Sequence, residues 1–354
     1  MGAARLSLRD LRVPVRQSVY HAIRGELDLA LRLDEDLLRL SHQYNDYAGL
    51  VLGHMSSGRE LMYMGRFGSS RLHLEEVLAL YDPISHHPVI HRTGDDPHVV
   101  SLAFLGIVFF CLGFPDQAMA RSKAAIAAAR SLAHPPSLAV ALTAAARLSW
   151  LLGDNAALEQ RVGELVSVAT EQGFPHWRAV GTIYRGWLQV NSGSVTGGLG
   201  LLRSGSTAHR ATGAESLRPY LIALAARAHE IAGQIEEAAT QLDDALQIVE
   251  KTGERWFAAE LNRLKCQLLL RQGHTAAAEE QYRKTLSIAR AQQAKMWELR
   301  AAAGLARLWH EQDRRAEARD LLAPIYGWFT EGFDTPDLKE AKALLDELGG
   351  AGST

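Results

Sequence analysis

The sequence predicts an all-α fold, a right-handed α-solenoid of about eight helix–turn–helix repeats with a C-terminal capping helix. The first observation is a glycine that recurs at steps of 40, 48, 40, 40, 40 and 40 residues. The second is that small residues recur at fixed distances on both sides of it. A constant period of roughly 20–50 residues is typical of stacked supersecondary units. The recurring glycines are Gly25, Gly65, Gly113, Gly153, Gly193, Gly233 and Gly273, and one further step of 40 residues reaches Asp313.

The small residues indicate that the two helices of each repeat cross closely. Seven positions before the turn stand Ser18, Gly58, Gly106, Ala146, Gly186, Ala226, Cys266 and Ala306. Five positions after it small residues again dominate, with Leu158 as the larger exception: Ala30, Ser70, Ala118, Leu158, Gly198, Ala238, Ala278 and Ala318. Cys266 fills one of these small positions, so we expect it to serve packing. With Cys111 as the only other cysteine, no disulfide framework is expected, which favours a reducing compartment.

Each repeat is predicted to contain two helices, and the third repeat shows the signals most clearly. Asp96 is a good N-cap and Pro97 suits the first helical turn. The helix then runs through Val99–Leu112, Gly113 ends it, and Pro115–Leu132 forms the second helix. A second turn follows about twenty residues after the first, where glycine or asparagine stops a helix in the left-handed conformation. These second turn positions are Asn45, Ala133, Gly173, Gly213, Gly253 and Gln293.

The predicted solenoid spans residues 11–348, between an N-terminal tail at 1–10 and a C-terminal tail at 349–354. An insert at 82–95 contains Pro83, Pro88 and Gly94 and is predicted to be a loop. The capping helix is expected at Leu338–Leu348, where it covers the apolar end of the stack. The predicted repeats are 11–46, 47–81, 96–134, 135–174, 175–214, 215–254, 255–294 and 295–333.

Composition and charge exclude several classes of partner. The chain has 354 residues, of which 47% are hydrophobic, and a formal net charge of −2. A nucleic acid or an anionic membrane surface needs a basic face, which this balance does not favour. No run approaches the roughly 18 apolar residues of a membrane span, and residues 1–15 lack the apolar core of a signal peptide. We therefore expect a cytoplasmic protein with no nucleic-acid or membrane partner.

The repeat pattern resembles tetratricopeptide-type (TPR) repeats in their longer form of about 40 residues. The residues that carry this resemblance are Gly106, Gly113 and Ala118 in one repeat, and Ala226, Gly233 and Ala238 in another. A closer resemblance covers nearly the whole chain. It is to the C-terminal repeat region of large bacterial proteins, class III adenylate/guanylate cyclases or predicted signalling ATPases. The segments that carry it are Leu112–Ala118, Ala169–Pro175, Thr252–Arg255 and Tyr326–Thr335.

This resemblance implies a sensor or scaffold module that works with a catalytic part. The sequence contains no G-x-x-x-x-G-K-[ST] phosphate loop, and no segment resembles a cyclase catalytic domain. The ATPase or cyclase activities are therefore expected on another chain or on an N-terminal part not included in this sequence. The predicted function is a non-catalytic interaction scaffold or sensor without a cofactor, whose partner is a protein or peptide segment. A small-ligand-sensing regulatory domain is the alternative.

A histidine cluster is the only group that suggests a metal-dependent enzyme. His86, His87, His91 and His98 stand in or beside the insert, and imidazole is a good ligand for zinc, copper or nickel. Their spacing matches no standard zinc signature, so a polar loop is the simpler interpretation. Asp95 and Asp96 do not form a catalytic pair, because neighbouring residues on a helix point in different directions.

The first helix of each TPR-type repeat lines the concave groove, so groove residues can be assigned by their distance from the turn glycine. An arginine stands six positions before the turn in four repeats and forms a possible ladder for carboxylates. Salt-bridged surface side chains are the alternative, and Glu230 and Glu260 are expected to neutralise part of the ladder. The two tryptophans are either binding anchors or core residues. The assigned groove residues are Arg59, Arg147, Trp150, Trp187, Asn191, Arg227, Glu230, Arg263, Gln267, Arg300, Arg307 and His310.

Overall fold

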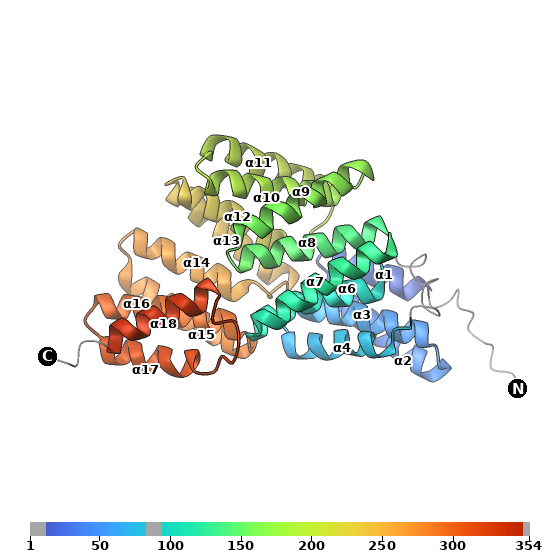
Figure 1. Cartoon of the computed structure of the whole chain (residues 1–354), viewed down its shortest axis with the longest axis horizontal. Coiled ribbons are helices and arrows are strands. Elements are labelled where there is room, and N and C mark those ends of the chain that lie inside the picture. The colour runs from blue at the N-terminus through green and yellow to red at the C-terminus, as the bar shows by residue number, and fades with distance from the viewer. Residues whose placement is uncertain (1–11, 83–93, 350–354) are drawn as a thin grey trace, which may run out of the picture.

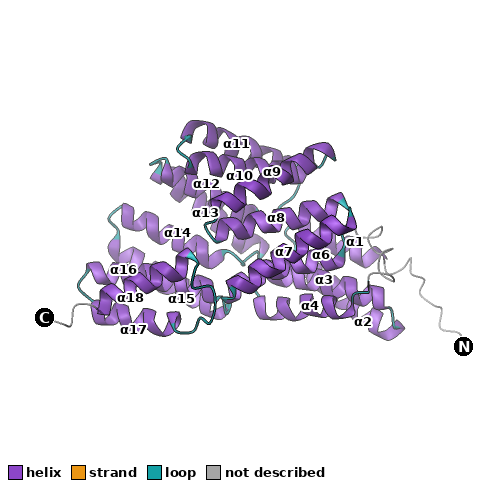
Figure 2. Ribbon diagram, in the orientation of Figure 1, coloured by secondary structure: helices purple, strands orange, loops and turns teal. Residues whose placement is uncertain are grey.

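The computed structural model describes residues 12–82 and 94–349, and all regular elements in these ranges are α-helices joined by short turns (Figures 1 and 2). In this described part the helices form eight consecutive antiparallel pairs, followed by α18. The predicted all-α solenoid is therefore confirmed. The helices are α1 (Arg12–Ile23), α2 (Leu27–Tyr44), α3 (Tyr47–Tyr63), α4 (Phe67–Leu80), α6 (Pro97–Leu112), α7 (Pro115–Leu132), α8 (Pro135–Leu151), α9 (Asn155–Glu171), α10 (Pro175–Asn191), α11 (Val195–Ala211), α12 (Arg218–Ile231), α13 (Ile235–Thr252), α14 (Ala258–Arg271), α15 (Thr275–Ala291), α16 (Lys295–Glu311), α17 (Arg315–Tyr326) and α18 (Pro336–Gly349).

Left-handed backbone conformations stand at every turn that the repeat pattern predicts. The seven recurring glycines have φ between 71° and 95°, and Asp313, at the eighth position, has φ 60°. The second turns also have positive φ, from 51° at Asn45 to 76° at Gly213. This conformation stops a helix without strain at glycine and at low cost at asparagine or aspartate. The 40-residue period is thus a period of helix ends.

The small residues lie where the two helices of a pair cross, as predicted. In the fifth pair, a Cβ added to Gly186 would lie 2.8 Å from the carbonyl oxygen of Gly198 and 2.8 Å from the amide nitrogen of Leu202. In the second pair, the Ser70 hydroxyl donates a hydrogen bond to the Gly58 carbonyl at 2.6 Å. Backbone meets backbone at these crossings, which leaves no room for larger side chains.

The first four repeats also contact the last four, so the solenoid closes on itself. The Ile23 carbonyl accepts a hydrogen bond from the Glu215 amide at 2.8 Å, and the Tyr63 carbonyl accepts one from the Trp256 amide at 3.0 Å. Farther along, Arg300 donates a hydrogen bond to the Leu151 carbonyl. Figure 1 shows one result: the first turn of α7 lies against the C-terminal part of the chain.

Two segments that carried the family resemblance form one of these contacts. Glu331, in the loop before α18, accepts hydrogen bonds from the backbone amides of Asp116 at 3.0 Å and Gln117 at 3.1 Å, in the first turn of α7. The Trp328 ring packs on Phe114, with 5.5 Å between ring centroids. The motifs Leu112–Ala118 and Tyr326–Thr335 are therefore two sides of one interface.

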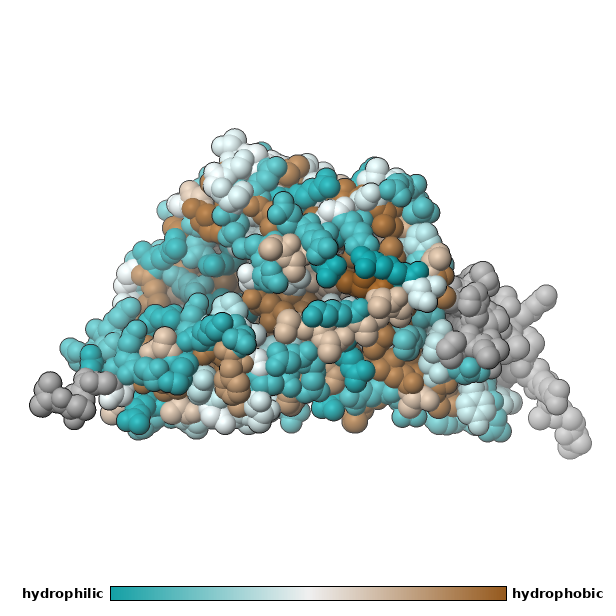
Figure 3. Space-filling model, viewed as in Figure 1, coloured by the Kyte–Doolittle hydropathy of each residue, from teal (hydrophilic) through white to brown (hydrophobic). Residues whose placement is uncertain are grey.

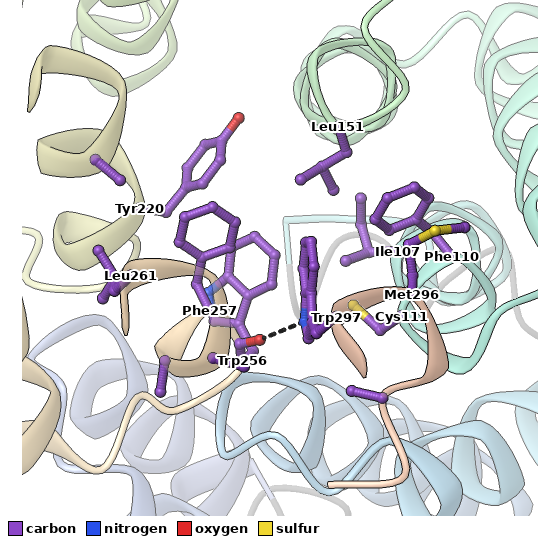
Figure 4. Packing of buried hydrophobic residues seen from close by; sticks show 14 of the residues in the cluster. Ile107, Phe110, Cys111, Leu151, Tyr220, Trp256, Phe257, Leu261, Met296 and Trp297 are labelled. Carbon is purple, nitrogen blue, oxygen red and sulfur yellow. Dashed lines mark hydrogen bonds between the residues drawn. The ribbon is translucent and has the colours of Figure 1, made fainter. Parts of the chain in front are cut away.

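Aromatic side chains from different repeats fill the middle of the molecule (Figure 4). The ring centroid of Phe257 lies 5.2 Å from that of Tyr220 and 5.5 Å from that of Trp297. Trp297 also packs on Phe110 at 5.5 Å and donates its indole N–H to the Trp256 carbonyl at 3.2 Å. Part of the surface that would line an open groove is thus core. The outer surface is mostly hydrophilic in the view of Figure 3.

The insert that the sequence places at 82–95 falls largely outside the described residues. His86, His87 and His91 lie there, so the structure does not locate them. His98 stacks on Tyr81, with 5.2 Å between ring centroids, and the Asp96 carboxylate caps α6 by accepting from the Val99 amide at 2.9 Å.

In the described ranges, no three His, Cys, Asp or Glu side chains gather as a metal site. No helix in those same ranges is long and apolar enough to span a membrane. Cys111 and Cys266 are both buried and free.

The close helix crossing predicts opposite effects for two glycine-to-alanine substitutions. Gly186→Ala should lower the free energy of unfolding by about 1–3 kcal/mol, because its methyl group meets backbone atoms. Gly163→Ala should raise it by about 0.5–1 kcal/mol, because Gly163 has open space around it and alanine favours the helix. Urea unfolding followed by circular dichroism measures both. A Gly186→Ala protein as stable as the wild type would contradict the packing scheme.

Candidate functional site

A cavity of about 540 Å³ near the C-terminal half collects most of the residues that the sequence assigns to a groove. We call it the C-terminal cavity. Its walls come from the first helices of the later repeats, α8, α10, α12, α14 and α16, with α18 closing one side. The assigned residues that line it are Trp150, Trp187, Asn191, Arg227, Arg263, Gln267, Arg300 and Arg307.

The other four assigned residues lie elsewhere. Arg59 and Arg147 line a separate cavity of about 320 Å³, which we call the N-terminal cavity. Glu230 lines neither cavity. It is buried and forms ion pairs with Arg227 and Arg271. His310 is half-buried on α16 and lines neither cavity. The expected arginine ladder is thus divided between two cavities.

A buried ion-pair network joins three helices at the C-terminal cavity. The Glu260 carboxylate accepts two hydrogen bonds from Arg263, both at 2.8 Å, and one from Arg300 at 3.1 Å. Arg300 also donates two hydrogen bonds to Asp337, both at 2.8 Å. Burial alone would raise the pKa of Glu260, but the two arginines outweigh it and lower this pKa to about 2. The network therefore ties α14, α16 and α18 together in the charged state.

The guanidinium group of Arg300 contacts two aromatic rings and a backbone carbonyl. It lies 5.2 Å from the Trp297 ring centroid and 5.5 Å from that of Phe110, while one N–H reaches the Leu151 carbonyl. Sequence reasoning found Arg300 but missed Asp337 and Glu340, which also line this cavity. Both belong to α18, which follows the last repeat and has no counterpart in the 40-residue register.

The remaining arginines of this cavity are less tightly held. Arg227 pairs with Glu230, and Arg307 lies 3.6 Å from Glu340, with half of its own side chain exposed. Trp150 and Trp187 pack edge to face at 5.8 Å. Their indole N–H groups are buried without a hydrogen-bond partner among the described residues. The cavity therefore offers guanidinium groups beside an aromatic wall.

The N-terminal cavity has a different electrostatic character. Arg59 donates two hydrogen bonds to the fully buried Glu60, at 3.0 and 2.8 Å. Asp34 is also fully buried. Burial and the nearby charge of Glu60 raise the pKa of Asp34 to about 8. Two carboxyl groups thus share one arginine, and one of them is held in its neutral form at pH 7.

Comparison with known proteins supports the fold and no more. No family model and no curated protein matches the sequence. The structure of a Rap protein complexed with Competence and Sporulation Factor superposes with a TM-score of 0.60 at 13% identity, covering 97% of each chain. The APC/C hetero-tetramer Cut9–Hcn1 superposes with a TM-score of 0.55 at 13% identity, and the match covers 98% of this chain and 57% of that chain. A signal transduction ATPase with a tetratricopeptide repeat sensor from Pyrococcus horikoshii has a TM-score of 0.47 at 10% identity, and the match covers 93% of this chain and 50% of that chain.

Removal of the Arg300 side chain should destabilise the C-terminal end of the solenoid. In Arg300→Leu the buried Glu260 keeps only Arg263 as a hydrogen-bonded cation, and Asp337 loses both of its hydrogen bonds to Arg300. We therefore expect the free energy of unfolding to fall by about 3–5 kcal/mol. Chemical denaturation measures this change in the free energy of unfolding. Hydrogen exchange should show the largest loss of protection in α18. Arg319→Leu, on the exposed face of α17, is the control and should stay within about 0.5 kcal/mol of the wild type.

The raised pKa of Asp34 predicts a loss of stability as pH increases. Its pKa rises from 3.8 to about 8 on folding, so between these values the folded state binds more protons than the unfolded state. Stability from this group is complete below pH 4 and declines up to about pH 8. Asp34→Asn removes the decline, so its melting temperature relative to the wild type should be higher at pH 8 than at pH 5. The exposed Asp28→Asn serves as control; an equal difference at both pH values for Asp34→Asn would contradict the assignment.

Proposed function

We propose that this chain is a non-catalytic scaffold or sensor module that binds a protein or peptide segment in its C-terminal cavity. The observation that carries the proposal is that eight groove residues assigned from the sequence meet around one recess of about 540 Å³. Their guanidinium and amide groups suit carboxylates and backbone carbonyls of a polypeptide. TPR-type stacks provide such surfaces by their architecture, which is an argument from the fold.

The Rap protein structure supports this proposal by analogy. Its chain is covered over 97% of its length, and it was solved with a bound factor. We infer further that the partner is a signalling ATPase or nucleotide cyclase, a step that rests on the sequence resemblance alone. A small acidic ligand is the second candidate, because about 540 Å³ lies within the usual range of ligand pockets, roughly 300–1,000 Å³.

Arg227 and Arg307 provide the sharpest test, because they line the cavity and their side chains are more exposed than those of Arg263 and Arg300. In Arg227→Ala/Arg307→Ala we expect binding to weaken at least tenfold, by loss of two charge-assisted contacts. Stability should change little, since Glu230 keeps Arg271 and partly exposed pairs contribute about 0–1 kcal/mol. The matched control is Arg315→Ala/Arg319→Ala, which removes two exposed arginines from α17.

The binding measurement is affinity capture from lysate of the source organism, followed by mass spectrometry. Recovery of an ATPase or cyclase polypeptide by the wild type and the control, but not by Arg227→Ala/Arg307→Ala, would support the proposal. Equal recovery by all three proteins would exclude this cavity as the site. Recovery of no partner would favour the small-ligand alternative, which a thermal-shift screen of metabolites then tests.

A further inference from the structure

The N-terminal cavity is separate from the proposed partner site and mostly apolar. It shares no lining residue with the C-terminal cavity. Its volume of about 320 Å³ lies at the small end of the range for ligand pockets, roughly 300–1,000 Å³. Apolar walls come from α1, α6, α8 and α10, and include Val19, Val100, Phe104, Ile107, Val140 and Trp177.

One strongly buried cation, Arg147, stands in this apolar wall. Only 3% of Arg147 is exposed. Its guanidinium lies 5.3 Å from the ring centroid of Trp256 and 5.7 Å from that of Tyr220. Within residues 12–82 and 94–349 it forms no ion pair, and its Nε has no hydrogen-bond partner. Burial of a charge without a counter-charge is costly, and aromatic rings offset only about 2 kcal/mol of that cost.

The other charges at the cavity do not balance Arg147. Arg59 and Asp95 also line it, but Arg59 donates its hydrogen bonds to Glu60, and the cation whose charge acts on Asp95 is Arg59 and not Arg147. Glu254 is the carboxyl group that interacts with Arg147 at longer range. It accepts hydrogen bonds from the Leu217 amide and the Trp256 indole. Because burial raises the pKa of Glu254 to about 8, this group is mostly neutral at pH 7.

We propose that the N-terminal cavity binds a small organic acid, with its carboxylate on Arg147 and its apolar body against Phe104, Ile107 and Trp177. A carboxylate supplies the missing counter-charge and accepts the charge-assisted hydrogen bonds that a guanidinium donates. The apolar body loses contact with water in a site of matching size. Arg147 selects for the acid, and the walls select for an apolar molecule that fits about 320 Å³.

The position of this cavity links the ligand to closure of the solenoid. One wall belongs to α1 and α3 in the first repeats, and another belongs to residues 212–217 after α11. These walls already touch, since the Ile23 carbonyl accepts hydrogen bonds from the Glu215 and Ser216 amides at 2.8 and 3.2 Å. A ligand between them contacts both halves at once. It therefore stabilises the closed form, which is the form that shapes the C-terminal cavity.

The probes that test this are 3-phenylpropanoate and its neutral isostere 3-phenylpropanamide, titrated by calorimetry into the full chain. The wild type should bind the acid about tenfold more tightly than the amide, the value expected for a charge-assisted contact. Arg147→Gln should lose this preference. Arg178→Gln, an exposed arginine on α10, should keep it. Acid binding should also raise the melting temperature of the wild type and of Arg178→Gln only.

A cavity-filling variant keeps the test valid if Arg147→Gln fails to fold. Ala144 lines the same cavity, and Ala144→Leu retains Arg147 while it occupies the space of the ligand. Loss of acid binding in folded Ala144→Leu supports the proposal, and unchanged binding overturns it. Equal binding of acid and amide by the wild type would also overturn it. So would tighter binding of a peptide that ends in a free phenylalanine, because the ligand would then be a polypeptide terminus.

Discussion

Contact between the first and last repeats is the constraint on which the rest of the structure depends. Backbone hydrogen bonds from Glu215 to Ile23 and from Trp256 to Tyr63 join segments that are distant in sequence. An isolated solenoid needs only contacts between neighbouring repeats. Here a second set of contacts turns the concave surface inward, so its residues are either core or cavity wall. This explains why tryptophans and arginines can share the same helix faces.

The closed form also decides which arginines a partner can use. Arg300 is held by Glu260, Asp337 and a backbone carbonyl, and it lies beside two aromatic rings. Loss of Arg300 or of either carboxylate would leave a buried charge without a partner. The role of Arg300 is therefore to fix α18 against α14 and α16. Arg307 is different, because it is half-exposed and lies 3.6 Å from Glu340. A ligand carboxylate can replace such a partner at little cost.

Local features of the fold could be predicted from sequence, and non-local features could not. The turns require positive φ and the helix crossings require small residues, so both leave a mark at fixed spacing, as at Gly186 and Gly233. Arg147 and Arg227 occupy the same repeat position, yet Arg147 is buried against Trp256 and Arg227 lines the C-terminal cavity. The surroundings of each arginine depend on which distant repeat packs against its helix. A pattern that repeats every 40 residues contains no information about such contacts.

The segments Leu112–Ala118 and Tyr326–Thr335 show how closure still leaves a trace in the sequence. Leu112–Ala118 contains the turn glycine Gly113 and the small residue Ala118 of the 40-residue pattern, whereas Tyr326–Thr335 contains no recurring turn glycine. Both segments also contain residues that the pattern does not require, such as Pro115, Glu331 and Gly332. Their contact explains this: Glu331 accepts from the first amides of α7, and a Cβ on Gly332 would meet Pro115 at 2.0 Å. A helix N-terminus favours an anion, and the close approach requires glycine. Specific residues are therefore needed where distant repeats meet, whereas contacts between neighbouring helices need only small or apolar ones.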